Sequence, residues 1–214
     1  FLRIVGGTSL TSAFPMDYAM GGGKSDLSRS GILLEAASFA DQGGWKLDTQ
    51  HFQQMGGCYL LAHGMGKPVK NARAMIHVPE TGTWNVWART RNWCPGEWQA
   101  PGRFKISVNG STLEPTFGTE KEDWSWQAGG AVNIDTPGKV DIELIDLTGF
   151  DGRCDAIYLT QEATPKLPGS NNLVELAAWK DQLAGRANHK VEEKVFDVII
   201  VGGGMSGCGA ALAA

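Results

Sequence analysis

The sequence predicts a mainly β protein: an antiparallel β-sandwich, then a linker helix, then the first strand, turn and helix of an α/β unit. Three observations support this prediction. Apolar residues alternate with polar ones in several segments between residues 32 and 160, which is typical of half-buried strands. Pro and Gly pairs separate these segments. A glycine-rich turn follows an apolar run close to residue 201.

Residues 1–27 are expected to be the remnant of an export signal and a leader. The stretch FLRIVGGTSLTSAFP has one basic residue followed by apolar and small residues. It is too short to span a membrane and suits the apolar part of a secretory signal. Phe1-Leu2-Arg3 also resembles the tail of the twin-arginine export motif, which implies a periplasmic or extracellular protein. The alternative is a leader without function.

Residues 28–162 are expected to form the sandwich. In the segment 84–91, Trp84, Val86 and Ala88 share one face of a strand, which we expect to point into the core. Asn109-Gly110 favours a tight hairpin turn of type I′ after a strand at 103–108. Further strands are expected at 140–144, where Val140, Ile142 and Leu144 point inward, and at 156–159. Turn signals at this spacing are typical of a β-sandwich.

Four tryptophans are candidate ligand contacts in this domain. Trp93, Trp98, Trp124 and Trp126 lie in segments that read as loops, where flat rings could stack on sugars. Arg91, Glu97 and Asp123 are nearby in the sequence and could bind hydroxyl groups. The alternative is that several of these rings fill the core or pack on a following domain, because aromatic side chains dominate core packing.

The first and last strands expected in the sandwich carry a resemblance to a known class of domain. Residues 34–36 (LEA), 43–45 (GGW) and 154–159 (CDAIYL) resemble the corresponding strands of carbohydrate-binding-module-like, jelly-roll sandwiches. Such modules often hold a structural calcium between these strands, and the resemblance implies Glu35 and Asp155 as its ligands. Ala37 stands where a second acid is usual. The alternative is that both carboxylates are ordinary surface groups.

Three longer segments resemble a more specific class. Residues 57–67 (GCYLLAHGMGK), 86–93 (VWARTRNW) and 147–155 (LTGFDGRCD) are similar to the domain that precedes FAD-dependent oxidoreductases in secreted bacterial proteins. That domain is related to the sugar-binding, golvesin-type domain attached to xanthan lyases. The resemblance implies an accessory sandwich joined to a flavin-dependent enzyme.

Residues 163–194 are expected to be a linker and a helix. Pro165, Pro168 and Gly169 give the first part a linker composition. Between residues 171 and 189, apolar residues recur at spacings of three and four, which predicts a helix capped by the preceding asparagines. Its Trp179 and Leu183 are expected to pack on a domain surface, and a partner-binding helix is the less favoured alternative.

Residues 195–214 are expected to begin a Rossmann-type domain. The apolar run 195–201 predicts a buried parallel strand. Gly202, Gly204 and Gly207 then follow the GxGxxG spacing that lets a dinucleotide pyrophosphate approach the helix N-terminus. The alternative is a glycine-rich turn that binds nothing. Asp197, Ser206 and the small residues after the turn resemble the FAD-binding start of flavoprotein oxidoreductases. The resemblance implies an FAD site at residues 202–207: Gly202, Gly203, Gly204, Met205, Ser206 and Gly207.

The net charge, the cysteines and the histidines argue against several classes of function. The net charge is −4 and no basic stripe suggests a nucleic-acid partner. No CxxC pair occurs, so a zinc or redox site of that type is not expected, whereas Cys58, Cys94 and Cys154 could supply a disulfide or remain buried thiols. His51 and His63 have no catalytic partner close in sequence.

The function predicted from the sequence is therefore part of a secreted FAD-dependent oxidoreductase that acts on a small-molecule or carbohydrate substrate. The Rossmann-type unit is expected to be incomplete at Ala214, with the catalytic residues outside this sequence. The alternative is a carbohydrate-binding sandwich, with a polysaccharide as its partner and no catalytic activity of its own.

Overall fold

The computed structural model describes residues 31–55, 57–169, 172–185, 195, 198–200 and 204–214. The expected leader, residues 1–27, lies outside these. The chain divides into two compact units, residues 13–187 and residues 1–12 with 188–214. None of the helices described is long and apolar enough to cross a membrane.

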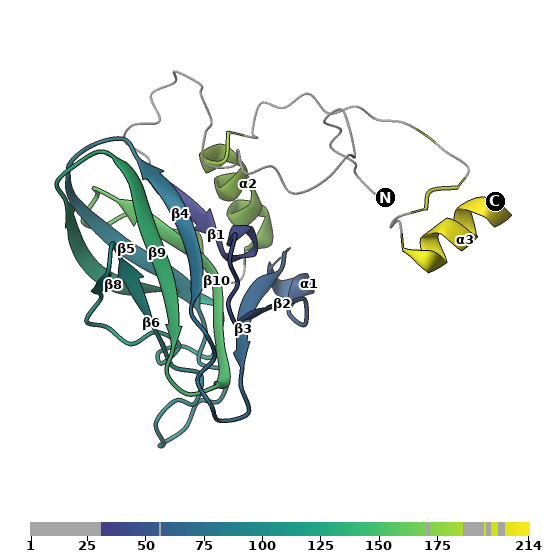
Figure 1. The fold of residues 1–214 in the computed structure, drawn as a ribbon. Coiled ribbons are helices and arrows are strands. Elements are labelled where there is room, and N and C mark those ends of the chain that lie inside the picture. The colour runs from purple at the N-terminus through teal and green to yellow at the C-terminus, as the bar shows by residue number, and fades with distance from the viewer. Residues whose placement is uncertain (1–30, 56, 170–171, 186–194, 196–197, 201–203) are drawn as a thin grey trace. The chain divides into compact units, whose positions relative to one another are not determined.

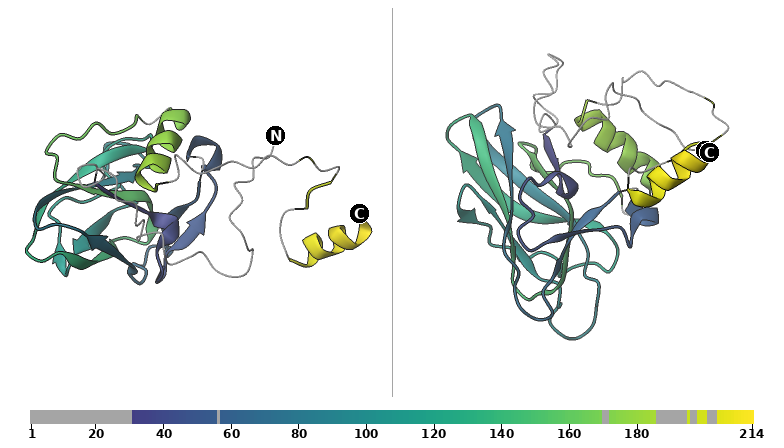
Figure 2. Two further views of the ribbon diagram at one scale, coloured as in Figure 1. Left: turned by 90° about the horizontal axis from the view of Figure 1, so that it is seen from above. Right: turned by 45° about the vertical axis from the view of Figure 1, so that its right-hand side comes forward.

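The larger unit is a sandwich of two antiparallel sheets (Figures 1 and 2). We name them sheet A and sheet B. Sheet A has six strands, with the order β2-β3-β10-β5-β8 and with β1 also paired to β10. Their bounds are β1 Ile32–Glu35, β2 Lys46–Asp48, β3 Tyr59–His63, β5 Gly82–Thr90, β8 Ser125–Ile134 and β10 Phe150–Thr160.

Sheet B has four strands in the order β4-β9-β6-β7. Their bounds are β4 Ala72–Val78, β6 Phe104–Val108, β7 Ser111–Thr112 and β9 Gly138–Asp146. The short helical segments of this unit are η3 Ala36–Ser38 and α1 Phe52–Met55. The turn between β6 and β7 has positive φ at both Asn109 and Gly110, as a type I′ hairpin requires. This hairpin prediction is confirmed.

The core lies between the two sheets and confirms the alternation read from the sequence. Trp84, Val86 and Ala88 of β5 are buried, as are the inward residues of β6 and β9. Trp45 and Phe104 meet edge to face inside this core, with 5.5 Å between their ring centroids. The core cluster thus draws on strands of both sheets and holds the two layers together.

Strand β10 organises sheet A. It pairs with β5 along one side, and along the other side it pairs with β3 at its beginning and with β1 at its end. The first and last strands of the sandwich are therefore neighbours, as the sequence predicted. The last strand is longer than expected and begins at Phe150, because its first residues pair with β3 rather than with β1.

Helix α2, Leu173–Leu183, covers part of the outer face of sheet A (Figures 1 and 2). It begins after Asn172, whose side chain accepts a hydrogen bond from the Glu175 backbone N–H, so the asparagine cap is confirmed. Leu176 is buried under the helix. Trp179 packs edge to face on Tyr158 and Trp126, with centroid distances of 5.0 and 5.5 Å.

A buried ion network fixes the same helix to the sheet. Asp155 of β10 is 1% exposed and accepts a hydrogen bond from Arg89 Nη1 at 2.8 Å. Lys180 Nζ of α2 lies 3.2 Å from Asp155 Oδ1 and 3.3 Å from Glu35 Oε1 of β1. Each charge is compensated by its neighbours, as buried charges require.

The smaller unit contains α3, Met205–Ala213. This helix begins directly after Gly204, so the predicted helix after the glycine turn is confirmed. Val198, Ile199 and Ile200 are not in a strand, although the sequence predicted one. A parallel strand needs neighbouring strands to pair with, and none pairs with these three residues in the part of the chain described.

We expect Asp155→Asn to lower the free energy of unfolding by about 3–5 kcal/mol, because it leaves the Arg89 guanidinium buried without its counter-charge. Urea denaturation measures the loss. Arg73→Gln is the matched control: Arg73 pairs with Glu143 at the surface, and removing such a pair costs about 1 kcal/mol or less. Equal losses in the two variants would contradict the buried network.

Candidate functional site

Two of the four candidate tryptophans are part of the packing of the sandwich. Trp124 is 3% exposed, and its ring packs on Tyr59 at 4.9 Å and on His51 at 5.9 Å. Trp126 lies in strand β8 rather than in a loop, and α2 covers it through Trp179. We therefore correct the sequence interpretation: Trp124 is buried in the packing of the sandwich, and Trp126 is a partly buried strand residue that packs on Tyr158 and Trp179, so neither belongs to an exposed loop surface.

The other two tryptophans do lie in a loop. Trp93 and Trp98 belong to the connection between β5 and β6, residues 91–103. Trp98 is 61% exposed, and its indole N–H donates to the Cys94 carbonyl at 3.1 Å. The Trp93 indole N–H donates to the Phe150 carbonyl at 3.0 Å. Backbone hydrogen bonds thus hold both rings in place, so little conformational freedom remains to be lost on binding.

Three loops meet at this end of the sandwich. The register of sheet A brings the end of β3 against the start of β10, where His63 pairs with Phe150. The buried carboxylate of Asp146 binds the loops together, accepting hydrogen bonds from the backbone N–H groups of Val69, Thr148 and Gly149. Phe150 is 51% exposed at the junction. The buried Asp146 carboxylate, whose hydrogen bonds are satisfied, therefore stabilises the conformation of these loops.

A histidine–aspartate pair stands beside these rings. His63 Nδ1 lies 2.5 Å from Asp151 Oδ1. Asp151 has φ of +60°, in the left-handed region that costs energy for a residue with a side chain. Arg153 Nη1 donates to the Asp151 carbonyl at 2.9 Å and supports this conformation. We define the loop-end site by five residues: His63, Trp93, Trp98, Phe150 and Asp151.

The loop-end site combines exposed aromatic rings with a carboxylate and an imidazole. Arg153 lies over the Trp93 ring, with 5.3 Å between its guanidinium carbon and the ring centroid, so a cation already covers one face of that ring. Trp98 and Phe150 present the larger exposed apolar areas. Such a surface can stack on a flat apolar ligand face while Asp151 and His63 bind polar groups at its edge.

The expected calcium ligands do come together, but around an ammonium group. Glu35 and Asp155 both lie within ion-pair distance of Lys180 Nζ. Among the described residues, no three His, Cys, Asp or Glu side chains are grouped as a metal site. As these side chains lie they do not fit Ca²⁺, because the cation position is held by Lys180, which would have to move away.

The glycine turn is described in part. Gly202 and Gly203 lie outside the described residues. Gly204 caps α3, and Met205, Ser206 and Gly207 form its first turn, where backbone N–H groups have no partner within the helix. The first helical hydrogen bond runs from Cys208 N–H to the Gly204 carbonyl at 2.9 Å. The site predicted for FAD stays a prediction.

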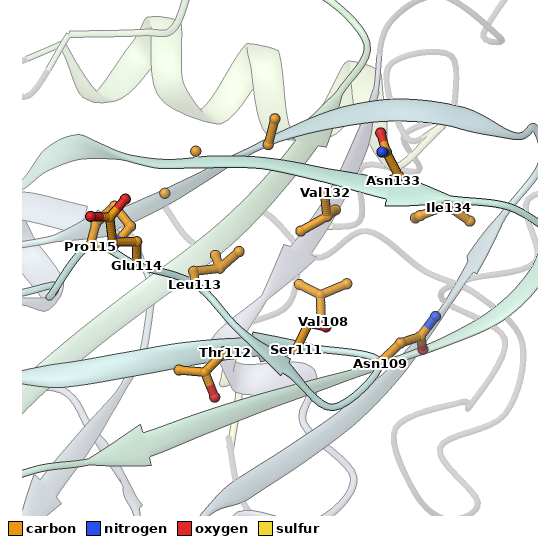
Figure 3. Close-up of a pocket in the computed structure, with 13 residues that line it drawn as sticks. Val108, Asn109, Ser111, Thr112, Leu113, Glu114, Pro115, Val132, Asn133 and Ile134 are labelled. Atoms are coloured by element: carbon orange, nitrogen blue, oxygen red, sulfur yellow. The ribbon is translucent and has the colours of Figure 1, made fainter.

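A groove of about 450 Å³ lies between β7 and β8, at the open edge of the sandwich (Figure 3). Val108, Leu113 and Val132 point toward its centre (Figure 3). Its lining contains no aromatic ring and one titratable side chain, Glu114. The groove therefore offers neither a stacking surface nor an acid–base pair, and we assign it no function.

The cysteines form no disulfide among Cys58, Cys94 and Cys154, which are thiols. Cys154 is fully buried in the core, and burial raises the pKa of its thiol. A buried thiol with a raised pKa is unreactive. The structure thus gives the buried-thiol alternative for Cys154.

Comparisons with known proteins concern the sandwich. No family model and no curated protein matches the chain. A Podospora anserina GH26-CBM35 β-(1,4)-mannanase structure is 20% identical with a TM-score of 0.49, covering 65% of this chain and 29% of that chain. A family 35 carbohydrate-binding module from Clostridium thermocellum is 19% identical with a TM-score of 0.48, covering 61% and 97%.

A third similar structure is the CBM36-1 domain of a multidomain xylanase from the hindgut metagenome of Trinervitermes trinervoides. It is 15% identical, with a TM-score of 0.47, and the match covers 62% of this chain and 98% of that domain. Because all three TM-scores lie below 0.5, these likenesses carry no argument about function.

Sequence reasoning missed the way in which the loop-end residues combine. His63 and the Asp151-Gly152-Arg153 segment could each be singled out, but they are 88 residues apart. Their contact depends on the pairing of β3 with β10. The sequence did not identify Phe150 as a site residue, because an aromatic residue next to a turn is common in any sandwich.

We expect Trp124→Ala to destabilise the protein by about 3–5 kcal/mol, since it empties a packed site. Trp98→Ala should change the free energy of unfolding by about 0.5 kcal/mol or less, as expected for an exposed side chain. Chemical denaturation of the two variants measures both values. A large loss for Trp98→Ala would mean that this ring is structural and not available for binding.

Proposed function

We propose that the loop-end site binds carbohydrate and that the sandwich acts as a binding module. The observation that carries this proposal is the exposure of Trp98, in the β5–β6 connection, and of Phe150, the first residue of β10. Exposed large aromatic rings are unfavourable in water unless a partner covers them. Sugar rings have apolar faces formed by C–H groups, which such rings can cover.

The polar members of the site suit the edge of a sugar. Asp151 is a hydrogen-bond acceptor, and the ring nitrogens of His63 can donate or accept. The contact between Nδ1 and Oδ1 holds these two side chains together. A pyranose presents hydroxyl groups around its rim, so one ligand can use the apolar and the polar groups together.

The proposed activity is binding without chemistry. Among the described residues, the His63 ring pairs with Asp151, and no hydroxyl or thiol group is hydrogen-bonded to that ring. Catalysis through such a pair requires a nucleophile or an activated water in reach. A secreted location, expected from the leader, accompanies the proposal as a prediction.

Affinity gel electrophoresis with galactomannan, xylan and laminarin tests the proposal. We expect the wild-type protein to be retarded by at least one of these polysaccharides. Trp98→Ala should weaken that binding about tenfold or more, because a central aromatic contact dominates small interfaces. Trp98→Phe keeps an aromatic face and should retain part of the affinity.

Met75→Ala is the matched control. Met75 is also an exposed large apolar side chain, but it lies on β4 in the other sheet. Its removal should leave retardation unchanged. Equal retardation of Trp98→Ala and Met75→Ala would remove the loop-end site as the binding surface, and absence of retardation by any sugar polymer would count against the proposed function.

A second proposal concerns the glycine turn, which we propose binds the pyrophosphate of FAD. The supporting observation is that α3 begins at Met205, immediately after the GxG residues. The unpartnered N–H groups of its first turn and the positive end of the helix dipole favour a phosphate there. FAD would supply hydride or electron transfer, whereas this segment would contribute cofactor binding.

Flavin absorbance of the protein, expressed with any downstream sequence that its gene encodes, tests this second proposal. Gly204→Val places a branched side chain where the backbone should approach the pyrophosphate, so we expect flavin content to fall about tenfold or more. Gly209→Ala is the control, because an added Cβ at Gly209 has open space. A colourless folded protein would contradict the FAD assignment.

A further inference from the structure

A group of cationic side chains lies on the outer face of sheet A, beside the loop-end site. The antiparallel register pairs Cys154 with Thr90. Arg153 precedes Cys154 and Arg91 follows Thr90, so the two arginines are neighbours on adjacent chain segments. Arg153 also faces Leu61 of β3 across the sheet. The pairing of β10 with β3 and with β5 therefore brings the two arginines onto neighbouring chain segments.

These two arginines differ from Arg73 and Arg89 because they lack carboxylate partners. Arg73 pairs with Glu143 and Arg89 pairs with Asp155. In the described part of the chain, neither Arg91 nor Arg153 forms an ion pair with a carboxylate. Cationic side chains that are largely withdrawn from water are normally paired.

Several hydrogen-bond donors in this group are buried without an acceptor. The Nε atoms of Arg91 and Arg153 are inaccessible and have no hydrogen-bond partner, and the inaccessible hydroxyl of Tyr59 lies close to Arg153 and Asp48 without meeting the geometry of a hydrogen bond. Tyr59 is fully buried and Arg153 is 6% exposed. Unsatisfied buried donors are costly and rare in folded proteins. What this group lacks is an acceptor, preferably one with negative charge.

Aromatic rings enclose the group and hold it in place. Tyr59, Trp124 and His51 pack on one another, and Trp93 lies against Arg153. Arg91 Nη1 is 3.4 Å from His51 Nε2 and 3.5 Å from His51 Nδ1. Arg91 and His51 are partly exposed, so the group borders solvent on that side.

Burial and neighbouring charged groups shift the pKa values of Arg91 and His51. Burial lowers the pKa of Arg91, and the neighbouring Arg153 lowers it further, while Asp123, Glu122 and Tyr59 act in the opposite direction. Burial and Arg91 likewise lower the pKa of His51, which Gln54 and Asp48 partly offset. Burial and the neighbouring cation therefore both disfavour the charged form of Arg91, and a bound anion would favour that form.

We propose that Arg91, Arg153 and the Tyr59 hydroxyl bind the carboxylate group of a small acidic molecule. A carboxylate offers two acceptor oxygens, and the planar guanidinium group matches that geometry with two parallel donors. The Tyr59 hydroxyl supplies a third donor. This inference does not depend on the carbohydrate proposal, because none of its three residues belongs to the loop-end site.

Titration of acetate into isotopically labelled protein, with sodium chloride replaced to keep ionic strength constant, tests the proposal. We expect saturable NMR shifts at the Nε–H groups of Arg91 and Arg153 and a rise in the pKa of His51. Arg91→Gln should weaken binding about tenfold or more, because it removes a charge-assisted pair. Arg73→Gln, at a surface arginine of sheet B, should leave binding unchanged.

Tyr59→Phe separates binding from folding. It keeps the ring and removes a buried hydroxyl that forms no hydrogen bond of good geometry in the free protein, so the melting temperature without acetate should not fall. Acetate binding should weaken severalfold, because the third donor is lost. A structural role for Tyr59 would give the reverse result, with reduced stability and unchanged binding.

Other probes identify the ligand class. D-glucuronate and N-acetylglutamate share the carboxylate and should compete with acetate, and their relative affinities tell whether an acidic sugar or an amino-acid-like molecule fits better. D-glucose lacks the charge and should give no shift at the two arginines. Equal responses to sulfate and acetate, or wild-type acetate affinity in Arg91→Gln, would overturn the proposal.

Discussion

The buried carboxylate of Asp155 is the constraint on which the arrangement of sheet A depends. It binds Arg89 of β5 and Lys180 of α2, and Lys180 in turn reaches Glu35 of β1. An uncompensated charge in this environment would be costly, so each group is stable there only while the others are in place. Two strands and a helix that are distant in the sequence are thereby fixed to β10.

That arrangement decides which surfaces remain open to a ligand. The core occupies the inner face of sheet A, and α2 covers Trp126 and Tyr158 on the outer face. The outer face also carries the Arg91 and Arg153 group. Next to that group, Trp98 lies in the β5–β6 loop and Phe150 lies at the start of β10. The two proposed sites are thus adjacent, and Arg153 contacts both through Trp93.

The sequence predicted local features well and distant contacts poorly. The alternation of apolar and polar residues predicted the inward residues of β5, β6 and β9, and Asn109-Gly110 predicted the hairpin. Both patterns depend on only a few consecutive residues. Trp126 was misplaced because Gly129 and Gly130 make β8 look like a loop, and because the helix that buries Trp126 comes some fifty residues later. Glu35 and Asp155 were correctly brought together, but their partner Lys180 gave no signal.

The left-handed backbone of Asp151 has a meaning for comparisons among related sequences. Glycine would adopt this conformation without the cost that a side chain incurs, so stability alone favours its replacement. Relatives that retain aspartate here should also retain a histidine at the position of His63, because the unfavourable backbone conformation of Asp151 places its carboxylate against that histidine. Relatives that carry glycine should be free to vary at that second position, and covariation of the two would mark which lineages still use this end of the sandwich.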